Sequence, residues 1–245
     1  MFKSITVLIP VFNDQEVLPE LHRRLKAVLD KDWQDYEMIL VDDGSGDSSW
    51  QEIEALHKQD DRIVGIRLMR NFGQQNAIAA GLDYAGGDVV VIMDSDLQDR
   101  PEDIPRLVQA LEENDASMAM ARWKSRKDSW FKLAVSRLFY SVSKKITNIR
   151  HEPNLAVFRA IKREVIEELR KYPEKTSTTL SLLYWIGVDY VAVDLERDPR
   201  FAGKSGYSLK KMLKLTADRI FSFSMFPIRA AILAGTLISA LSFFT

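Results

Sequence analysis

Along the first 121 residues, short apolar runs alternate with segments whose hydrophobic residues recur at helical spacing. Five short runs rich in β-branched and apolar residues are typical of strands. These runs cover residues 5–10, 36–43, 63–69, 88–94 and 116–121. Segments with the 3.6-residue period of amphipathic helices separate them, most clearly at 16–30 and 48–60. Strands that alternate with helices predict an α/β fold with a largely parallel sheet flanked by helices.

The second half of the chain departs from this alternation. Residues 122–150 carry nine basic side chains and one acidic, and we expect a helix over most of the stretch after Asp128. A further strand is predicted at 188–196, and 197–208 has the composition of a loop. Residues 208–225 predict an amphipathic helix whose apolar stripe is flanked by lysines, as in helices that lie on a membrane surface.

The sequence ends in an uncharged run at 230–245. A helix that spans a bilayer needs roughly 20 apolar residues, and this run is shorter. It therefore predicts either a buried terminal helix or a transmembrane segment that the sequence enters without completing. The basic flank and the amphipathic segment before it favour the second interpretation, so we expect a truncated membrane segment at 227–245.

Composition limits the chemistry that the chain can perform. Its 245 residues, 46% of them hydrophobic, suffice for one α/β domain with an appendage. The absence of cysteine excludes disulfides, a thiolate nucleophile and cysteine zinc sites, and the three histidines, at 22, 57 and 151, are expected at the surface. Any metal must be held by oxygen, which favours Mg²⁺ or Mn²⁺. The first residues predict a strand rather than a signal peptide.

Charge divides the chain into two halves. Residues 1–121 contain 11 Lys and Arg against 24 Asp and Glu, whereas residues 122–245 contain 23 against 11. An acidic first half is unsuited to nucleic acid and suited to a cation. A basic second half rich in Trp, Phe and Leu suits phosphate groups or an anionic membrane surface.

The stretch "VVVIMDSDLQDRPED" ends a buried strand in clustered carboxylates. Asp94 and Asp96 would lie on one side of a tight turn, where a divalent cation can bridge them to a diphosphate. The alternative is a solvated turn in which Asp99 or Asp103 caps the next helix. The Asp-x-Asp pair alone does not decide between these interpretations.

Two other predicted strands also end in polar side chains. In "VDDGSGDSS", Asp42 and Asp43 can accept hydrogen bonds from a nucleobase or ribose. In "RNFGQQNA", Arg70 and Asn71 can meet phosphate or ribose, and Gly73 opens the turn into a helix whose N-terminus attracts anions. Each could be an ordinary loop, but three polar strand ends in one parallel sheet favour a ligand site at its carboxyl edge.

These stretches, together with "TVLIPVFNDQEVLPEL" and "ERDPRFAGKSGYSLKKML", resemble the polyprenyl-phosphate glycosyltransferases over almost the whole chain. This branch of the family 2 glycosyltransferases includes dolichyl-phosphate mannose synthases and bactoprenol glucosyltransferases. The resemblance implies a Rossmann-like GT-A fold, a nucleotide-sugar donor, Mg²⁺ or Mn²⁺, and an undecaprenyl or dolichyl phosphate acceptor. It also implies inversion at the anomeric carbon and allows a homo-oligomer.

The resemblance assigns roles to residues that match the family's motifs. The implied metal ligands are Asp94, Asp96 and Gln98. The implied donor-binding residues are Pro10, Asn13, Glu16, Asp42, Asp43, Arg70, Asn71, Gly73, Asp94 and Ser95. The implied acceptor-phosphate residues are Arg122, Lys132, Arg137, Arg200, Lys204 and Ser205. Asp94, Asp96 and Arg122 are the implied catalytic residues.

The chain departs from the family pattern in two places. Where relatives often read "GESKY", residues 203–207 read "GKSGY", so the basic side chain has moved to Lys204. Where relatives often read "GDFRL", this chain reads "NLAVFRA", and a general base proposed at that Asp has no counterpart near Asn154. A lipid phosphate has a second pKa of about 6, so its oxygen is already mostly deprotonated at neutral pH and can attack without a base.

We therefore expect a GT-A catalytic domain at 1–206, with a donor half at 1–121 and an acceptor half at 122–206. An interfacial helix at 207–226 and the membrane segment at 227–245 would anchor it to the cytoplasmic face of the inner membrane. UDP-sugars are favoured over GDP-sugars. Two alternatives stay open: a related transferase with a saccharide or other lipid acceptor, which needs a general base, and a catalytically idle nucleotide-binding scaffold.

Overall fold

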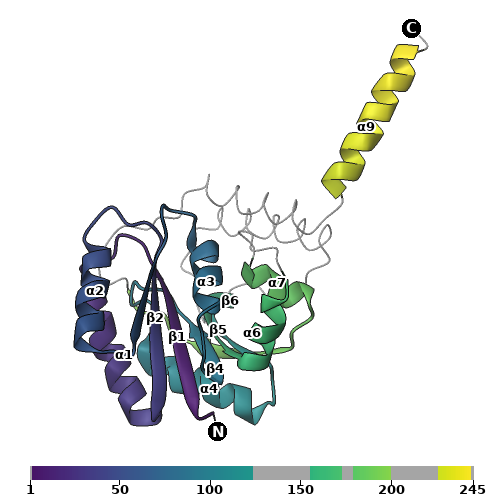
Figure 1. Cartoon of the computed structure of the whole chain (residues 1–245). Helices are drawn as coiled ribbons and strands as arrows, with labels where there is room; N and C mark the ends of the chain where they lie inside the picture. The colour runs from purple at the N-terminus through teal and green to yellow at the C-terminus, as the bar shows by residue number, and fades with distance from the viewer. Residues whose placement is uncertain (1, 124–154, 173–178, 200–225, 244–245) are drawn as a thin grey trace. The chain divides into compact units, whose positions relative to one another are not determined.

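The computed structural model describes residues 2–123, 155–172, 179–199 and 226–243 (Figure 1). The chain divides into two compact units. One consists of Met1–Arg126 with Glu152–Ser205, and the other of Lys127–His151 with Gly206–Thr245. The predicted basic helix after Asp128 and the predicted amphipathic helix at 208–225 lie outside the described residues.

The described part of the first unit contains one seven-stranded sheet. Its strands are β1 (Ser4–Val11), β2 (Asp35–Asp42), β3 (Ile63–Arg67), β4 (Val89–Ile92), β5 (Met118–Trp123), β6 (Leu155–Lys162) and β7 (Tyr190–Leu195). Its helices are α1 (Leu18–Asp32), α2 (Ser49–Gln59), α3 (Gln74–Leu82), the short 3₁₀ helix η1 (Pro101–Asp103), α4 (Ile104–Glu113), α6 (Arg163–Arg170) and α7 (Thr179–Trp185).

The strand order is β3-β2-β1-β4-β6-β5-β7. Strands β1 to β4 run parallel, as the alternation of strands and helices predicts, and β5 runs parallel to β7. Strand β6 lies antiparallel to both β4 and β5, so the sheet is mostly parallel but mixed. The sequence pattern predicted six of these strands and missed β6.

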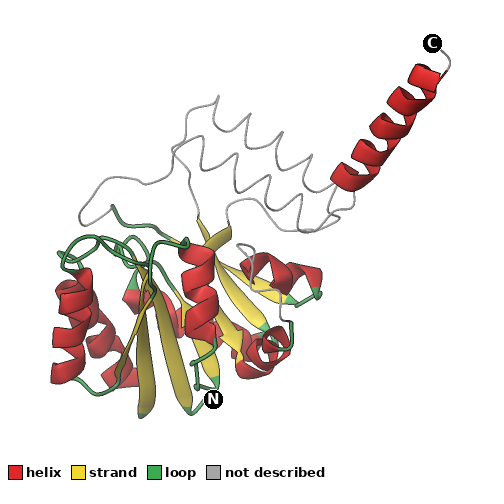
Figure 2. Cartoon of the chain, turned by 45° about the horizontal axis from the view of Figure 1, so that its top comes forward, coloured by secondary structure: helices red, strands yellow, loops and turns green. Residues whose placement is uncertain are grey.

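Helices cover both faces of the sheet (Figures 1 and 2). On one face, alternate residues of β1 such as Ile5, Val7 and Ile9 are completely buried in the main hydrophobic cluster. Helices α1, α2 and α4 contribute their apolar stripes to this cluster, for example Leu21 and Leu25 of α1. Helix α3 packs on β1 and β2, and α6 packs on β6.

The order of the strands indicates where in the sheet a ligand would bind. The chain proceeds outward from β1 to β2 and β3 and then returns to β4 on the other side of β1. Crevices in open α/β sheets form at the carboxyl ends of strands where the direction of winding reverses. The loops after β1 and β4 flank this point, and they contain Asn13 and Asp94.

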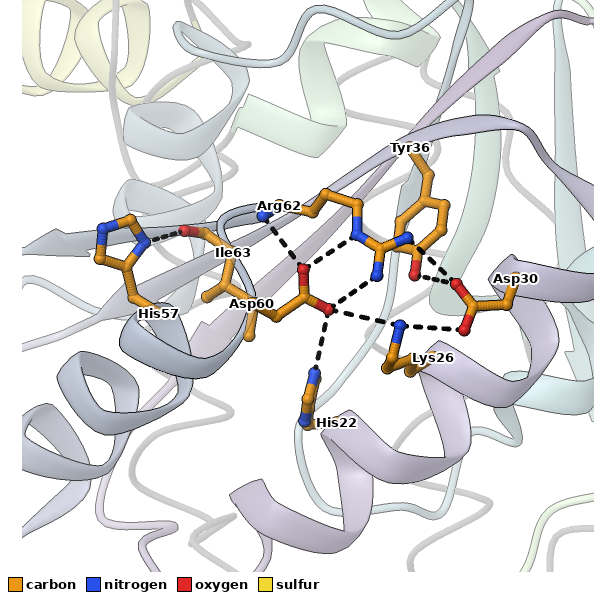
Figure 3. A network of polar contacts seen from close by, with 8 residues as sticks. All are labelled: His22, Lys26, Asp30, Tyr36, His57, Asp60, Arg62 and Ile63. Atoms are coloured by element: carbon orange, nitrogen blue, oxygen red, sulfur yellow. Dashed lines mark hydrogen bonds and ion pairs between the residues drawn. The ribbon is translucent and has the colours of Figure 1, made fainter.

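A set of charged side chains lies at the opposite, amino end of β2 and β3, and we call it the amino-end network (Figure 3). The guanidinium of Arg62 donates to Asp60 at 2.9 and 3.1 Å and to Asp30 at 3.0 Å. Asp30 also accepts from the hydroxyl of Tyr36 at 2.6 Å and pairs with Lys26 at 2.9 Å. The donated hydrogen bonds and adjacent positive charge lower the pKa of both carboxyls to about 2.

Two histidines adjoin this network. The side chain of His22 is only 15% exposed and its Nε2 lies 3.6 Å from Asp60, so the expectation of a surface histidine is wrong there. An amphipathic helix can bury a polar residue beside its apolar stripe when another element supplies a partner. His57 is exposed, as expected, with its Nδ1 2.6 Å from the carbonyl oxygen of Ile63. His151 lies outside the described residues.

In the second unit, the described residues form helix α9 (Phe226–Phe243), in which Ile228, Ile232, Leu233, Leu237 and Ile238 are exposed. None of the helices in the described parts of the chain has the combined length and hydropathy that crossing a bilayer requires. The predicted membrane segment at 227–245 stays a prediction.

Candidate active site

Hydrogen bonds join the loops that follow β1, β2 and β4. After β1, Asn13 adopts a positive φ of 56°, and its side-chain oxygen accepts from the backbone N–H of Gly46 at 2.8 Å. Its own N–H donates to Ser45 Oγ at 2.9 Å. The hydroxyl of Ser95 donates to Asp14 at 2.5 Å and thereby ties the β4 loop to the β1 loop. The structure thus brings three of the predicted strand ends together.

Asp42, the last residue of β2, and Asp43, the residue after it, are both buried. Asp42 is completely buried, accepts from the N–H of Ser45 at 2.9 Å, and lies 3.5 Å from the guanidinium of Arg67. Asp43 accepts the backbone N–H groups of Phe72 and Gly73 at 2.7 and 2.9 Å. In this structure, therefore, Asp42 stabilises the loop that follows β2, and Asp43 stabilises the turn that leads into α3.

Two glycines make the close approach of these loops possible. Gly44 has a φ of +68°, and a Cβ there would lie 2.4 Å from the backbone carbon of Arg70. Gly73 has a φ of +95° immediately before α3, a backbone conformation that residues other than glycine adopt only with strain. Arg70 and Asn71 are exposed at the resulting turn, with the guanidinium of Arg70 4.7 Å from the ring of Phe72.

We call residues 94–99 the acidic loop. Asp94 is half-buried, and its Oδ1 accepts from the side-chain amide of Gln74 at 2.5 Å. Asp96 is 8% exposed and accepts from the N–H of Gln98 at 3.1 Å. Asp99 is 1% exposed and accepts from the N–H of Asp94 at 3.2 Å. Burial, followed by the negative charge of Asp94, raises the pKa of the Asp99 carboxyl well above its ordinary value.

The predicted metal ligands do not all converge. Among the described residues, no three His, Cys, Asp or Glu side chains are arranged to hold a metal ion. Gln98 turns toward the segment after β7. Its side-chain amide donates to the backbone carbonyl of Asp198 at 3.3 Å, and its backbone carbonyl accepts from the N–H of Asp198 at 3.1 Å. Asp94 and Asp96 thus offer carboxylate oxygens in the acidic loop, while Gln98 anchors a neighbouring segment.

The other predicted residues are distributed as follows. Pro10 is buried at the end of β1, and Glu16 is exposed before α1. The guanidinium of Arg122 donates to Asp194 of β7 at 2.6 Å, and both side chains are about half exposed. The other predicted acceptor-phosphate residues, Lys132, Arg137, Arg200, Lys204 and Ser205, lie outside the described residues.

Two residues beside the acidic loop were missed at the sequence level. Gln74 lay inside the "RNFGQQNA" motif, but nothing in the sequence distinguished it from Gln75. Arg159 is 4% exposed on β6 and interacts electrostatically with Asp94. A charged residue within an apolar strand was a usable signal for Arg159, since a buried arginine requires partners.

Comparison of the sequence with known proteins identifies the family. Residues 6–170 match the model of "Glycosyl transferase family 2". An uncharacterised glycosyltransferase of Bacillus subtilis is 37% identical over 97% of this chain and 74% of its own length. The bactoprenol glucosyl transferase of Shigella phage SfV is 33% identical over 98% and 78%. An undecaprenyl-phosphate 4-deoxy-4-formamido-L-arabinose transferase of an Enterobacter species is 34% identical over 98% and 73%.

Solved structures share the fold at lower identity. Glucosyl-3-phosphoglycerate synthase from Mycobacterium tuberculosis, in complex with Mn²⁺, UDP-glucose and phosphoglyceric acid, matches with a TM-score of 0.63 and 18% identity over 88% of this chain and 76% of its own. A mannosyltransferase from Pyrobaculum calidifontis, in complex with GDP-mannose and Mn²⁺, matches with a TM-score of 0.55 and 22% identity over 83% of this chain, but over only 58% of its own. The mixed sheet is accordingly a GT-A-like fold, and the chain belongs to glycosyltransferase family 2.

Proposed function

We propose that this glycosyltransferase moves one sugar from a nucleotide-sugar, with UDP favoured, to a polyprenyl phosphate at the cytoplasmic face of the membrane. The observation that carries the proposal is the junction of the β1, β2 and β4 loops at the carboxyl edge of the sheet, with Asp94 and Asp96 beside it. The names of two relatives, a bactoprenol glucosyl transferase and an undecaprenyl-phosphate sugar transferase, support the acceptor.

The donor would lie along this edge of the sheet. Asn13, Glu16 and Asp42, with Pro10 and Asp43, would line its nucleoside end. Arg70, Asn71, Gly73 and Ser95 would line the ribose and diphosphate end, where the turn before α3 presents backbone N–H groups. Since Asp43 already holds this turn through Phe72 and Gly73, a donor contact there would also orient the residues that face the diphosphate.

The acidic loop fits a divalent cation, Mg²⁺ or Mn²⁺. Such cations prefer oxygen, and with nucleotide substrates they commonly take one or two carboxylates together with phosphate oxygens and water. Asp94 and Asp96 provide two carboxylates, and Gln98 would join them only by leaving Asp198. When bound, the cation would offset the negative charge that develops on the departing diphosphate.

The acceptor phosphate would act as the nucleophile. Its oxygen is mostly deprotonated at neutral pH, since the second pKa of a phosphate monoester is about 6, so the missing carboxylate near Asn154 is not needed. Attack from the face opposite the leaving diphosphate inverts the anomeric carbon. Arg122 would orient the phosphate together with Lys132, Arg137, Arg200, Lys204 and Ser205. The positive charge of the arginines and lysines among them would reduce the repulsion between acceptor and donor phosphates.

The test is transfer of labelled sugar into an organic-soluble product. Wild-type protein is incubated with undecaprenyl phosphate, Mn²⁺ or Mg²⁺, and each of a panel of UDP- and GDP-sugars. We expect label in the organic phase with one UDP-sugar, and its loss with a chelator or in Asp96→Ala. Transfer to a saccharide instead, or donor binding without turnover onto any acceptor, would refute the proposed reaction.

A further inference from the structure

The carboxylate of Asp94 is held from the side of α3. The amide of Gln74, in the first turn of that helix, donates to Asp94 Oδ1 at 2.5 Å. A carboxylate in its ionised form can only accept, so the Gln74 nitrogen must face it. The neighbouring Gln75 is directed elsewhere: its side-chain oxygen accepts from the backbone N–H of Leu180 at 3.1 Å. Only one of the two adjacent glutamines therefore reaches the acidic loop.

Gln74 is itself fixed by contacts to a different strand end. The two residues before it, Phe72 and Gly73, donate their backbone N–H groups to Asp43 after β2. Asp43 is thus connected to Asp94 by hydrogen bonds at both ends of the short backbone segment 72–74. This segment joins the predicted nucleoside end of the donor site to the predicted metal end.

Arg159 lies on β6, next to the strand that leads into the acidic loop. It pairs with Ile92 of β4, two residues before Asp94, and paired residues of neighbouring strands project to the same face. The Arg159 side chain is anchored, since its Nε and Nη2 donate to the carbonyls of Val157 and Ala156 at 2.9 and 2.8 Å. In the part of the chain that the structure describes, its buried Nη1 has no hydrogen-bond partner.

Electrostatics connects Arg159 to the acidic loop. Burial lowers the pKa of the Arg159 guanidinium, while Tyr184 and the charge of Asp94 act to raise it. A buried arginine is expensive unless a negative charge offsets it, and crowded carboxylates are expensive unless a positive charge lies near. The charges of Arg159 and Asp94 therefore favour each other.

We propose that Gln74 and Arg159 are positioning residues that fix the Asp94 carboxylate for the cation and the donor diphosphate. This inference rests on the function proposed above. Gln74 sets the direction of the carboxylate from α3, and Arg159 supplies positive charge behind it from β6. Neither residue need touch the substrate, so both act through Asp94.

The test measures Mn²⁺ binding directly, by the electron paramagnetic resonance signal of free Mn²⁺ during titration of the full chain with UDP present. We expect Gln74→Ala to raise the apparent Kd for Mn²⁺ by about 10- to 100-fold, the usual cost of losing a residue that orients a metal ligand. Gln75→Ala is the matched control, and its affinity should stay near that of the wild type. Equal affinity of Gln74→Ala and Gln75→Ala overturns the role of Gln74.

Arg159 is tested with two substitutions, each checked for folding by thermal unfolding. Arg159→Lys keeps the positive charge and should retain more Mn²⁺ affinity than Arg159→Met, which removes it. A folded Arg159→Met protein with wild-type affinity overturns the role of Arg159. If this variant does not fold, the comparison of Gln74→Ala with Gln75→Ala still decides the inference.

The Asp94→Ala protein distinguishes a failure of this inference from a failure of the proposed function. If wild type binds Mn²⁺ and Asp94→Ala does not, an unaffected Gln74→Ala refutes this inference alone, whereas no binding by wild type refutes the proposed function as well.

Discussion

The amino-end network and the acidic loop lie at opposite ends of the same sheet and treat their carboxylates differently. At the amino end, Arg62, Lys26 and Tyr36 surround Asp30 and Asp60, whose pKa values fall to about 2 (Figure 3). In the acidic loop, burial and the neighbouring charge of Asp94 raise the pKa of Asp99. The first cluster is electrostatically satisfied and stabilises the fold. In the second, Asp99 is buried beside the negative charges of Asp94 and Asp96, and a bound cation would offset part of that charge.

The sharpest difference between the clusters should appear on removing a carboxylate from the acidic loop. Asp96→Asn should reduce sugar transfer by about 10³-fold, the equivalent of the several kcal/mol that a metal ligand contributes to the transition state. Its free energy of unfolding should be unchanged or higher, because the substitution removes one of several crowded charges. Initial rates and urea unfolding measure the two effects. A variant that keeps its activity but unfolds more easily would assign Asp96 to the fold.

The same substitution in the amino-end network should have the opposite effect. Asp60→Asn leaves the guanidinium of Arg62 without its main partner, so the free energy of unfolding should fall by about 2 to 3 kcal/mol. The rate of transfer by the folded enzyme should not change. Asp61→Asn is the control, since Asp61 is the adjacent residue and is exposed. Equal unfolding midpoints for Asp60→Asn and Asp61→Asn would show that the network contributes nothing measurable.

Acid should weaken the amino-end network selectively. The ordinary Asp pKa of 3.8 falls to about 2 at Asp30 and Asp60 in the folded protein. Depressed folded values mean that this stabilisation is fully present above about pH 4 and is lost as the pH falls toward 2. Urea midpoints measured from pH 6 down to 2 should drop less steeply for Asp60→Asn than for the wild type. Asp30 contributes less, because its side chain is 45% exposed and solvent screens it.

The smallest effect on stability is expected at the Arg122–Asp194 pair. Both side chains are about half exposed, so Asp194→Asn should change the free energy of unfolding by less than about 1 kcal/mol. If Arg122 receives the acceptor phosphate, freeing it from Asp194 should lower the KM for polyprenyl phosphate while the KM for the donor stays constant. A change confined to the donor KM would contradict the assigned role of Arg122.

Local hydrophobic patterns were sufficient for most of the fold. The runs at 36–43 and 63–69 correspond to β2 and β3 within two residues at either end. Strand β6 was missed because Arg159 interrupts its apolar pattern, and in the folded protein two backbone carbonyls and the charge of Asp94 make its burial tolerable. Asp94 is distant in sequence, and the two carbonyls reach the guanidinium only in the folded geometry. The hydrophobic period of the sequence alone therefore could not reveal the strand.

The candidate site was predicted in outline for a similar reason. Parallel strands place their carboxyl ends along one edge, so polar residues after β2 and β4, such as Asp43 and Asp94, could be expected near each other. The particular contacts could not. The bond from Gln74 to Asp94 depends on how α3 packs, and the pairing of Arg122 with Asp194 depends on β7 lying beside β5. Neither arrangement follows from local periodicity.

The most direct test of the contrast between the two clusters is calorimetric titration of UDP into the full chain, with Mn²⁺ and then with a chelator. We predict that UDP binds with Mn²⁺, that the chelator abolishes binding, and that Asp96→Asn abolishes it while Asp60→Asn leaves it intact. UDP binding of equal affinity with Mn²⁺ and with the chelator would contradict the account, because the acidic loop would then not hold the cation that joins the donor to the protein.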